Sequence, residues 1–459
     1  MSSKSTSVRR AVWAGGVVVA WWLGVGLLSR VTGPSADVWT ERLFTIGLAL
    51  TYLACWFGLS ASSASASSGS SHWAMPRHIQ LRAIGTSLIL VVLVALLELP
   101  AAFGLLSYAG ILETTAVTDA FIADAALSFR RPPGAAWTGQ VRSDLASAWN
   151  VPLAPQKAIS FTTDAQGFRN VTDPTRADVA LIGDSYVEGW YVSDDATVAT
   201  VLERRLRRPV SNLAVSGYGT LQELEVLRRY ALALRPRLVA WFFFEGNDLY
   251  DDQSFEDTML YLEDHDVEDL GFDLGLGFDW PRFRRASLVR NAQRWLRRAT
   301  HPLIPQRLPP HGWFLDNTGT RHLLAYHDYA ALEFTEYEEE RFATTQRAIR
   351  EGVALGRDHG VVVIPIFVPM KFRIYGRHCT FAPESPCRRW QPWNLAERFT
   401  TFCADEGLDC VDLSPLMQAE AAAGRLLYAP EDSHWNEAGH QFVAAQLDAL
   451  WQRLDLEAQ

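Results

Sequence analysis

Hydrophobic and polar positions divide this chain into two unlike parts. In the first quarter, three long runs are apolar and nearly free of charge. At roughly 20 residues, each is long enough to cross the hydrocarbon core of a bilayer. They predict a membrane anchor at residues 1–112, with transmembrane helices at about 11–29, 43–60 and 83–108.

The first run also fits a cleavable signal peptide, because Lys4, Arg9 and Arg10 precede it. Its length and the lack of a small-residue cleavage site favour a retained helix. The third run contains one ionisable side chain, Glu98. A carboxylate within a membrane span is a functional candidate by default. Here Pro100 favours a kink or the membrane surface instead.

Positive charge sets the expected orientation. Basic residues before the first run slightly outnumber those in the loop after it, which places the N-terminus in the cytoplasm. Three spans then put everything after about residue 112 on the outer face of the inner (cytoplasmic) membrane.

Four of the five cysteines agree with that placement. Cys379 with Cys387, and Cys403 with Cys410, are close enough for one or two disulfides, which form in oxidising compartments. Neither pair has the spacing of a zinc knuckle. Free thiols are the alternative.

After a connecting segment at residues 113–157, short apolar runs alternate with helical patterns. Strands are expected at 177–182, 210–215, 238–244, 361–368 and 408–413, and helices at 197–208, from 220, and at 332–358. Thr220 with Glu223 has the spacing of a capping box. Buried strands that alternate with helices predict a three-layer α/β domain with a doubly wound parallel sheet, at residues 158–459.

An insertion at about residues 249–330 separates the third and fourth strands and is too long for one crossover helix. Its acidic first half predicts a solvated loop, because it lacks the ligand alternation of an EF-hand. Its basic second half carries Leu288, Ala292, Trp295 and Leu296 on one helical face. That half fits a helix on an anionic membrane or one packed on the sheet. The whole insertion is expected to act as a lid or substrate-shaping cap.

Net charge narrows the function. The 42 Lys and Arg residues against 52 Asp and Glu residues leave a net charge of −10, and the acidic excess belongs to the outer domain. This balance excludes a nucleic-acid-binding protein that works by neutralising phosphates.

Four polar motifs occur at strand ends or near the C-terminus. Gly183-Asp184-Ser185 ends the first strand, Gly217 follows the second, and Gly246-Asn247-Asp248 ends the third. Asp432-Ser433-His434 lies near the end of the chain. Ligands bind at the carboxyl ends of parallel strands, so the first three motifs are expected at one site.

These residue types suit nucleophilic catalysis. A serine hydroxyl becomes an effective nucleophile when a base takes its proton, and imidazole has a suitable pKa. Ser185 is the candidate nucleophile and His434 its base. Asp432 is the candidate that orients the imidazole, with Glu431 as the alternative. His440 is expected to be a helix histidine, and no metal or cofactor is predicted.

The four motifs, in this order, resemble the blocks of the SGNH (GDSL-like) hydrolase family over about residues 158–455. The resemblance implies an oxyanion hole built from the backbone N–H groups of Ser185 and Gly217 and the side-chain amide of Asn247. The last block, with Trp435 after His434, resembles an Asp-x-His-Trp branch. That branch includes proteins of alginate and related exopolysaccharide O-acetylation.

Together these features predict a membrane-anchored, extracytoplasmic serine esterase or O-acyltransferase. It would act through an acyl-Ser185 intermediate on acyl, mainly acetyl, groups of a glycan or a small ester. Water as acceptor gives an esterase and a sugar hydroxyl gives a transferase, which would need a membrane partner to deliver acyl groups. The alternative is a catalytically silent SGNH fold that serves as a membrane-complex subunit or a glycan-binding module.

Overall fold

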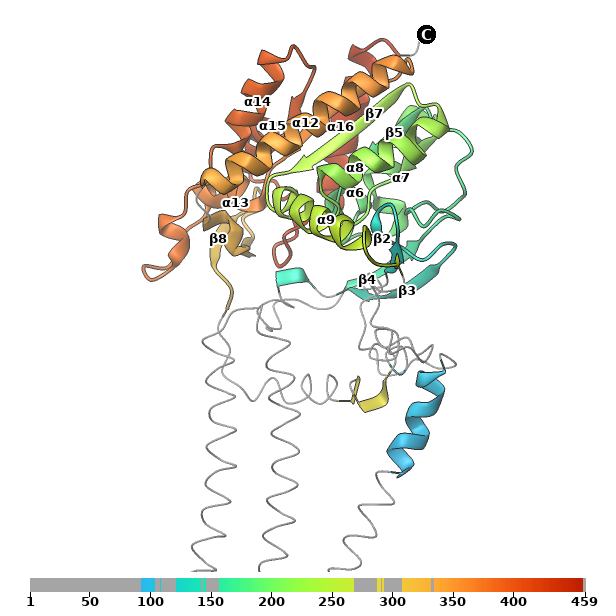
Figure 1. Cartoon of the computed structure of the whole chain (residues 1–459). Coiled ribbons are helices and arrows are strands. Elements are labelled where there is room, and N and C mark those ends of the chain that lie inside the picture. The colour runs from blue at the N-terminus through green and yellow to red at the C-terminus, as the bar shows by residue number, and fades with distance from the viewer. Residues whose placement is uncertain are drawn as a thin grey trace, which may run out of the picture. The chain divides into compact units, whose positions relative to one another are not determined.

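The computed structural model describes residues 92–103, 108, 121–141, 143–145, 157–267, 287–289, 291–292, 308–331 and 334–456 (Figure 1). The chain forms two compact units. One consists of Met1–Tyr108 with Ala286–Ala292, and the other of Ala109–Arg285 with Gln293–Gln459. The second unit carries all the candidate catalytic residues.

A five-stranded parallel sheet forms the centre of the second unit. Its strands lie in the order β6 (Val210–Asn212), β5 (Val179–Ile182), β7 (Leu238–Phe244), β10 (Val362–Val368) and β11 (Val411–Asp412). Counted along the chain this is the order 2-1-3-4-5 of a doubly wound sheet, as predicted. The winding direction changes between β5 and β7, which is where such sheets bind ligands.

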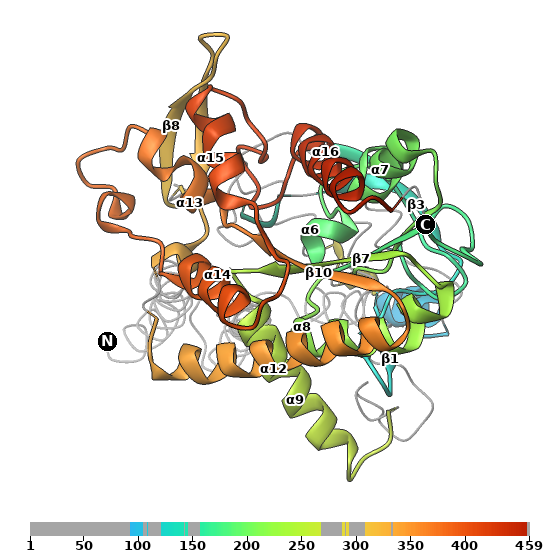
Figure 2. The ribbon, with the colours of Figure 1, turned by 90° about the horizontal axis from the view of Figure 1, so that it is seen from above.

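Helices cover both faces of the sheet. Every residue of β5 and β7 is therefore buried. Leu181 and Phe242 belong to the core on one face, and Ile182 and Trp241 to the core on the other. The helices are α7 (Val198–Leu206) and α16 (Glu437–Arg453) on the first face, and α8 (Thr220–Val226) and α12 (Glu336–Asp358) on the second (Figure 2).

Helix α8 begins at Thr220 but not by the predicted capping box. Its N-cap is Gly219, whose N–H donates to Gln222 Oε1 at 3.3 Å. Glu223 instead points towards the sheet and accepts a hydrogen bond from Trp241 Nε1 at 2.7 Å. The expected role of Glu223 was therefore wrong, because the buried indole N–H of Trp241 needs an acceptor.

The insertion starts with a helix rather than a solvated loop. Helix α9 (Asp248–Leu262) contains the first of the acidic residues. Asp252 is fully buried and accepts hydrogen bonds from the Leu221 N–H and the Thr345 hydroxyl. The acidic residues did not indicate a solvated loop, because one of them, Asp252, is hydrogen-bonded to neighbouring helices. Further on, β8 (His311–Leu315) and β9 (Arg321–Ala325) form an antiparallel hairpin.

Residues before the sheet also contribute strands. Strands β1 (Ile122–Asp124) and β2 (Ser128–Arg130) form one hairpin, and β3 (Ala136–Val141) pairs with β4 (Lys157–Thr162). The carbonyl of Phe129 accepts a hydrogen bond from Tyr218 Oη at 2.6 Å. Part of the segment expected only to connect the two regions is thus packed against the catalytic fold.

Within the described residues, no helix has both the length and the apolar character needed to cross a membrane. The predicted spans at about 11–29 and 43–60 lie outside the described residues, as do residues 83–91 of the third. Residues 92–102 of that third run are helical.

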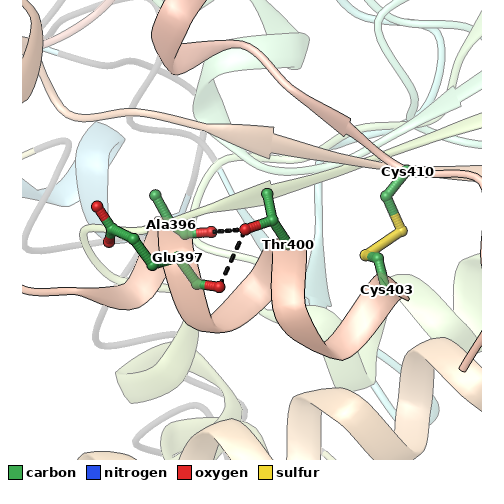
Figure 3. The surroundings of a disulfide bond; sticks show 5 residues. All are labelled: Ala396, Glu397, Thr400, Cys403 and Cys410. Carbon is green, nitrogen blue, oxygen red and sulfur yellow. Dashed lines mark hydrogen bonds between the residues drawn. A yellow bond between two sulfur atoms is a disulfide. The ribbon is translucent and has the colours of Figure 1, made fainter. Parts of the chain in front are cut away.

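One of the two cysteine pairs is bonded. A disulfide joins Cys403, near the end of α14 (Leu395–Asp405), to Cys410, just before β11 (Figure 3). Cys379 and Cys387 are free thiols.

Candidate active site

Ser185 stands where β5 turns into the short helix α6 (Ser185–Glu188). Gly183 permits this turn, because a Cβ there would lie 3.0 Å from Val187 Cγ2. Asp184 is the N-cap and accepts from the Tyr186 N–H at 3.0 Å. Its second oxygen lies 3.2 Å from the Ser185 hydroxyl. The turn therefore fixes Ser185 at the carboxyl end of the sheet.

His434 and Asp432 meet Ser185 from a distant part of the chain. His434 Nε2 lies 2.8 Å from Ser185 Oγ, and His434 Nδ1 lies 2.6 Å from Asp432 Oδ1. Glu431 is turned elsewhere and accepts a hydrogen bond from Tyr191 Oη at 2.7 Å. Of the two candidate carboxylates, the structure brings only Asp432 to the imidazole.

Neighbouring charges set the protonation states of this triad. Burial alone would raise the pKa of Asp432, but the adjacent His434 lowers it to about 2. Burial alone would lower the pKa of His434, but Asp432 and two further carboxylates raise it to about 9. Only neutral imidazole can accept the serine proton, so the fraction of competent His434 increases as the pH rises towards and through about 9.

The loop that carries Asp432 and His434 is held by a buried lysine. Lys371, at the start of α13 (Lys371–Tyr375), donates to three backbone carbonyls at 2.6 to 3.1 Å, those of Ala429, Pro430 and Asp432. Tyr186 Oη donates to the Ser433 carbonyl at 2.7 Å. The Lys371 bonds tie the loop of the acid and base to α13, and the Tyr186 bond ties it to α6, the helix of the nucleophile.

A buried ion pair holds the end of α6, the helix that begins with Ser185. Arg131 donates two hydrogen bonds of 2.7 Å to Glu188 at the end of α6, and both side chains are fully buried. The Ser216 hydroxyl also donates to Glu188. Burial alone would raise the pKa of Glu188, but Arg131 and Ser216 hold it below its usual value. Glu188 thus connects the nucleophile helix to the turn before Gly217.

The sheet order places the two other candidate oxyanion donors on either side of Ser185, because β5 lies between β6 and β7. Gly217 has a φ of +82°, a conformation that side chains rarely adopt, so its N–H position depends on glycine. Asn247 is the N-cap of α9.

Asn247 has one amide hydrogen engaged and one left for a substrate. Its Nδ2 donates to Asp251, and a carboxamide nitrogen has two hydrogens. Burial raises the pKa of Asp251 to about 8, with Asp184 adding to the effect. Asp251 orients the amide through this hydrogen bond, and its raised pKa disfavours a negative charge beside the developing oxyanion.

Most of the catalytic fold matches the family model described as GDSL-like lipase/acylhydrolase, over residues 181–442, more than half of the chain. The chain belongs to this family. The assignment supports a carboxylic ester hydrolase, and the matched range includes Ser185, Gly217, Asn247, Asp432 and His434.

Solved structures similar to this GDSL-like chain share little sequence with it. A GDSL-like lipase from Bacteroides thetaiotaomicron is 14% identical, with a TM-score of 0.30, over 61% of this chain and 89% of that one. A lipase/acylhydrolase from Enterococcus faecalis is 15% identical, with a TM-score of 0.30, over 60% and 94%. An acetyl xylan esterase is 10% identical, with a TM-score of 0.32, over 59% and 98%. No curated protein sequence matches the chain.

His434 in this GDSL-like site is arranged for acid–base chemistry. Asp144, Asp432 and His434 each offer one atom that could bind a metal ion, and these atoms lie within 4.8 Å of one another. Both ring nitrogens of His434 are already engaged, one by Asp432 and one by Ser185. His440 is buried in α16, where burial lowers its pKa to about 3.

Sequence motifs alone do not reveal Asp144. It lies outside the family match, and no glycine or histidine beside it signals chemistry. The structure nevertheless places its backbone N–H 2.8 Å from Asp432 Oδ2. Arg131 and Lys371 were missed because each is a single charged residue whose partners are distant in sequence.

Proposed function

We propose that this protein is a membrane-anchored, extracytoplasmic serine esterase or O-acyltransferase that acts on O-acyl groups of a glycan or surface polymer. One observation carries the catalytic part. His434 lies within hydrogen-bond distance of both Ser185 and Asp432, at 2.8 and 2.6 Å. This is the relay that turns a serine hydroxyl into a nucleophile.

The residues perform acylation as follows. Ser185 Oγ attacks the ester carbonyl while His434 Nε2 takes its proton, and Asp432 stabilises the imidazolium. The carbonyl oxygen becomes an oxyanion that the N–H groups of Ser185, Gly217 and Asn247 are placed to receive. When the tetrahedral intermediate collapses, His434 returns the proton to the leaving alcohol and the acyl group stays on Ser185.

Deacylation decides between the two activities. His434 takes a proton from the incoming hydroxyl, whose oxygen attacks the acyl-Ser185 carbonyl. Water releases a free acid, whereas a sugar hydroxyl forms a new ester. Both routes use the same residues, so the access of each acceptor to the acyl-enzyme decides the outcome.

Resemblance to the Asp-x-His-Trp branch supports a polysaccharide substrate. In this chain the tryptophan of that motif, Trp435, is fully buried and packs edge-to-face on Tyr186, with ring centroids 5.0 Å apart. It therefore packs inside the protein beneath the catalytic loop and is not available to contact a sugar. The resemblance is the reason for choosing O-acetyl groups as the acyl class to test.

Acetyl transfer is the direct test of this proposal. The purified full-length protein would be incubated with O-acetylated alginate and an unacetylated oligosaccharide acceptor. Acetate release is measured by proton NMR, and acceptor acetylation by mass spectrometry. We expect one or both products. Absence of both, together with no labelling by a fluorophosphonate probe, would favour the catalytically silent subunit or glycan-binding module.

Exposed apolar side chains support the membrane anchor. In the helical residues 92–102 and the adjoining turn, six large hydrophobic side chains are 46 to 74% exposed, namely Val92, Leu93, Leu96, Leu97, Leu99 and Phe103. An exposed cluster of this kind is typical of a surface that meets lipid or another protein.

Glu98 within this helix has a protein partner. Its carboxylate accepts hydrogen bonds from the Ser287 hydroxyl at 2.9 Å and from the Leu288 and Val289 N–H groups at 3.0 and 2.8 Å. A carboxylate at the start of a helical turn satisfies backbone donors that would otherwise be unpaired. This arrangement supports a structural role for Glu98 near the membrane surface.

Reporter fusions test the proposed topology. Alkaline phosphatase joined after Gln459 is expected to be active in a bacterial host, because that enzyme folds only where its disulfides form. The Cys403–Cys410 disulfide supports the same side of the membrane. Green fluorescent protein fused at the same point serves as the cytoplasmic control. A fluorescent control with an inactive phosphatase would reverse the orientation.

A further inference from the structure

Asp144 lies before the sheet, outside the range of the family match, and contacts the catalytic loop. Its backbone N–H donates to Asp432 Oδ2 at 2.8 Å. Its carboxylate accepts from the Ser433 N–H at 3.0 Å and from the Ser433 hydroxyl. The neighbouring Ser143 hydroxyl donates to the Glu431 carbonyl. Residues 143–144 therefore bind three consecutive residues of the loop that presents His434.

Asp144 also faces the imidazole itself. Its Oδ2 lies 3.9 Å from His434 Nδ1, while Asp432 Oδ1 is bonded to the same nitrogen at 2.6 Å. The Asp432 side chain is fully buried and that of Asp144 is 24% exposed. Two carboxylates of different solvent exposure thus surround one ring nitrogen, and only the first bonds it directly.

We propose that Asp144 is a positioning residue that holds the Asp432–His434 loop in its catalytic geometry and stabilises the imidazolium with a second negative charge. The proposal deepens the esterase function above and rests on it for its kinetic readout only. It extends the catalytic apparatus to a segment before the sheet, so a fragment that began at β5 would lack part of it.

The charge on Asp144 is present when it is needed. Burial and the nearby Asp432 raise its pKa to about 6, whereas His434 opposes that rise. The pKa of His434 is raised to about 9. Because 6 lies below 9, Asp144 is an anion throughout the range in which His434 gains and loses its proton.

Several other ionisable groups surround Asp144 and His434. Asp184 faces His434 across Ser185 and also raises the pKa of the imidazole. Burial lowers the pKa of Lys371 to about 8, although Asp144 and Asp432 oppose this. The remaining neighbours are phenols whose pKa values burial raises, so they stay neutral, namely Tyr186, Tyr191 and Tyr329.

Asp144→Asn is the sharpest test, because it removes the charge but keeps the backbone N–H and an oxygen acceptor for Ser433. We expect the pKa of His434 to fall by about one unit, the low end for a charge at this distance that is partly exposed. The acid limb of kcat/KM should move to lower pH by the same amount. The plateau of kcat should fall by up to about tenfold, because one unit of pKa is a tenfold change in proton affinity.

NMR measures the pKa of His434 without any substrate. The full-length protein in detergent micelles, labelled at histidine ¹³Cε1, is titrated, and His434→Ala assigns the resonance. Asp195→Asn is the matched control, because Asp195 is exposed in the same unit. Asp144→Glu, which restores a carboxylate, should return the pKa towards the wild-type value. If Asp144→Asn fails to fold, Asp144→Ser carries the same comparison.

The outcomes separate this inference from the proposed function. A His434 pKa that falls in Asp144→Asn but not in Asp195→Asn supports the role of Asp144, whether or not a substrate has been found. A His434 pKa equal to that of the wild type would overturn it, even in a protein that hydrolyses esters normally. Loss of thermal stability with an unchanged pKa would reduce Asp144 to a packing residue, which also contradicts the proposal.

Discussion

Ser185→Ala is expected to lower kcat for ester hydrolysis by roughly 10⁴- to 10⁶-fold, the range seen when a triad nucleophile is removed. The Ser185 hydroxyl is placed to receive the acyl group while His434 takes its proton. Without it, any residual turnover would come from water attacking an ester held by the oxyanion donors. KM should change little, because the Oγ atom contributes mainly in the transition state.

Covalent labelling distinguishes loss of chemistry from loss of structure. Wild-type protein should react with a fluorophosphonate probe, and Ser185→Ala should not, while their thermal unfolding midpoints agree. Ser254→Ala is the matched control, because Ser254 is an exposed serine on α9 whose hydroxyl donates to a backbone carbonyl of its own helix. Equal labelling of wild type and Ser185→Ala would place the nucleophile elsewhere.

The central strands were predictable because their sequence leaves little choice. Strand β7 occupies residues 238–244 as predicted, since a run of seven apolar residues fits only a strand buried on both faces. Strand β6 ends at Asn212 instead of Val215. The Asn212 side chain accepts a hydrogen bond from the Ala214 N–H and donates one to the Val187 carbonyl. Backbone bonds to the β5 segment continue past the end of the strand, from the Leu213 N–H to the Leu181 carbonyl and from the Val215 N–H to the Gly183 carbonyl.

The distant partners within the site could not be predicted. The motifs indicated Ser185 and His434, because glycine-flanked polar residues at strand ends have a recognisable spacing. The Asp-x-His-Trp resemblance favoured Asp432 over Glu431, and in the structure Asp432 bonds the imidazole whereas Glu431 bonds Tyr191. Asp144 and Arg131 gave no signal, because each is a single charged residue whose partner is more than 50 residues away.

Asp432→Asn is expected to lower kcat by roughly 10⁴-fold, because the imidazole would then be held in the wrong tautomer. Three N–H groups converge on the two Asp432 oxygens: the His434 ring and backbone N–H groups on Oδ1, and the Asp144 N–H on Oδ2. An asparagine offers one oxygen and one NH₂ group. If the NH₂ faces Nδ1, His434 carries its proton on Nε2 and cannot accept one from Ser185.

Glu431→Gln provides the matched control for this prediction, because it makes the same chemical change one residue earlier. Glu431 accepts a hydrogen bond from the Tyr191 hydroxyl and does not contact His434. Its replacement should therefore change kcat by less than about tenfold, the scale of one lost hydrogen bond. The pH profile supplies a second readout. Asp432 raises the pKa of His434, so the acid limb should move to lower pH in Asp432→Asn and stay in place in Glu431→Gln. A larger loss in Glu431→Gln than in Asp432→Asn would transfer the triad carboxylate to Glu431 and contradict the observed geometry.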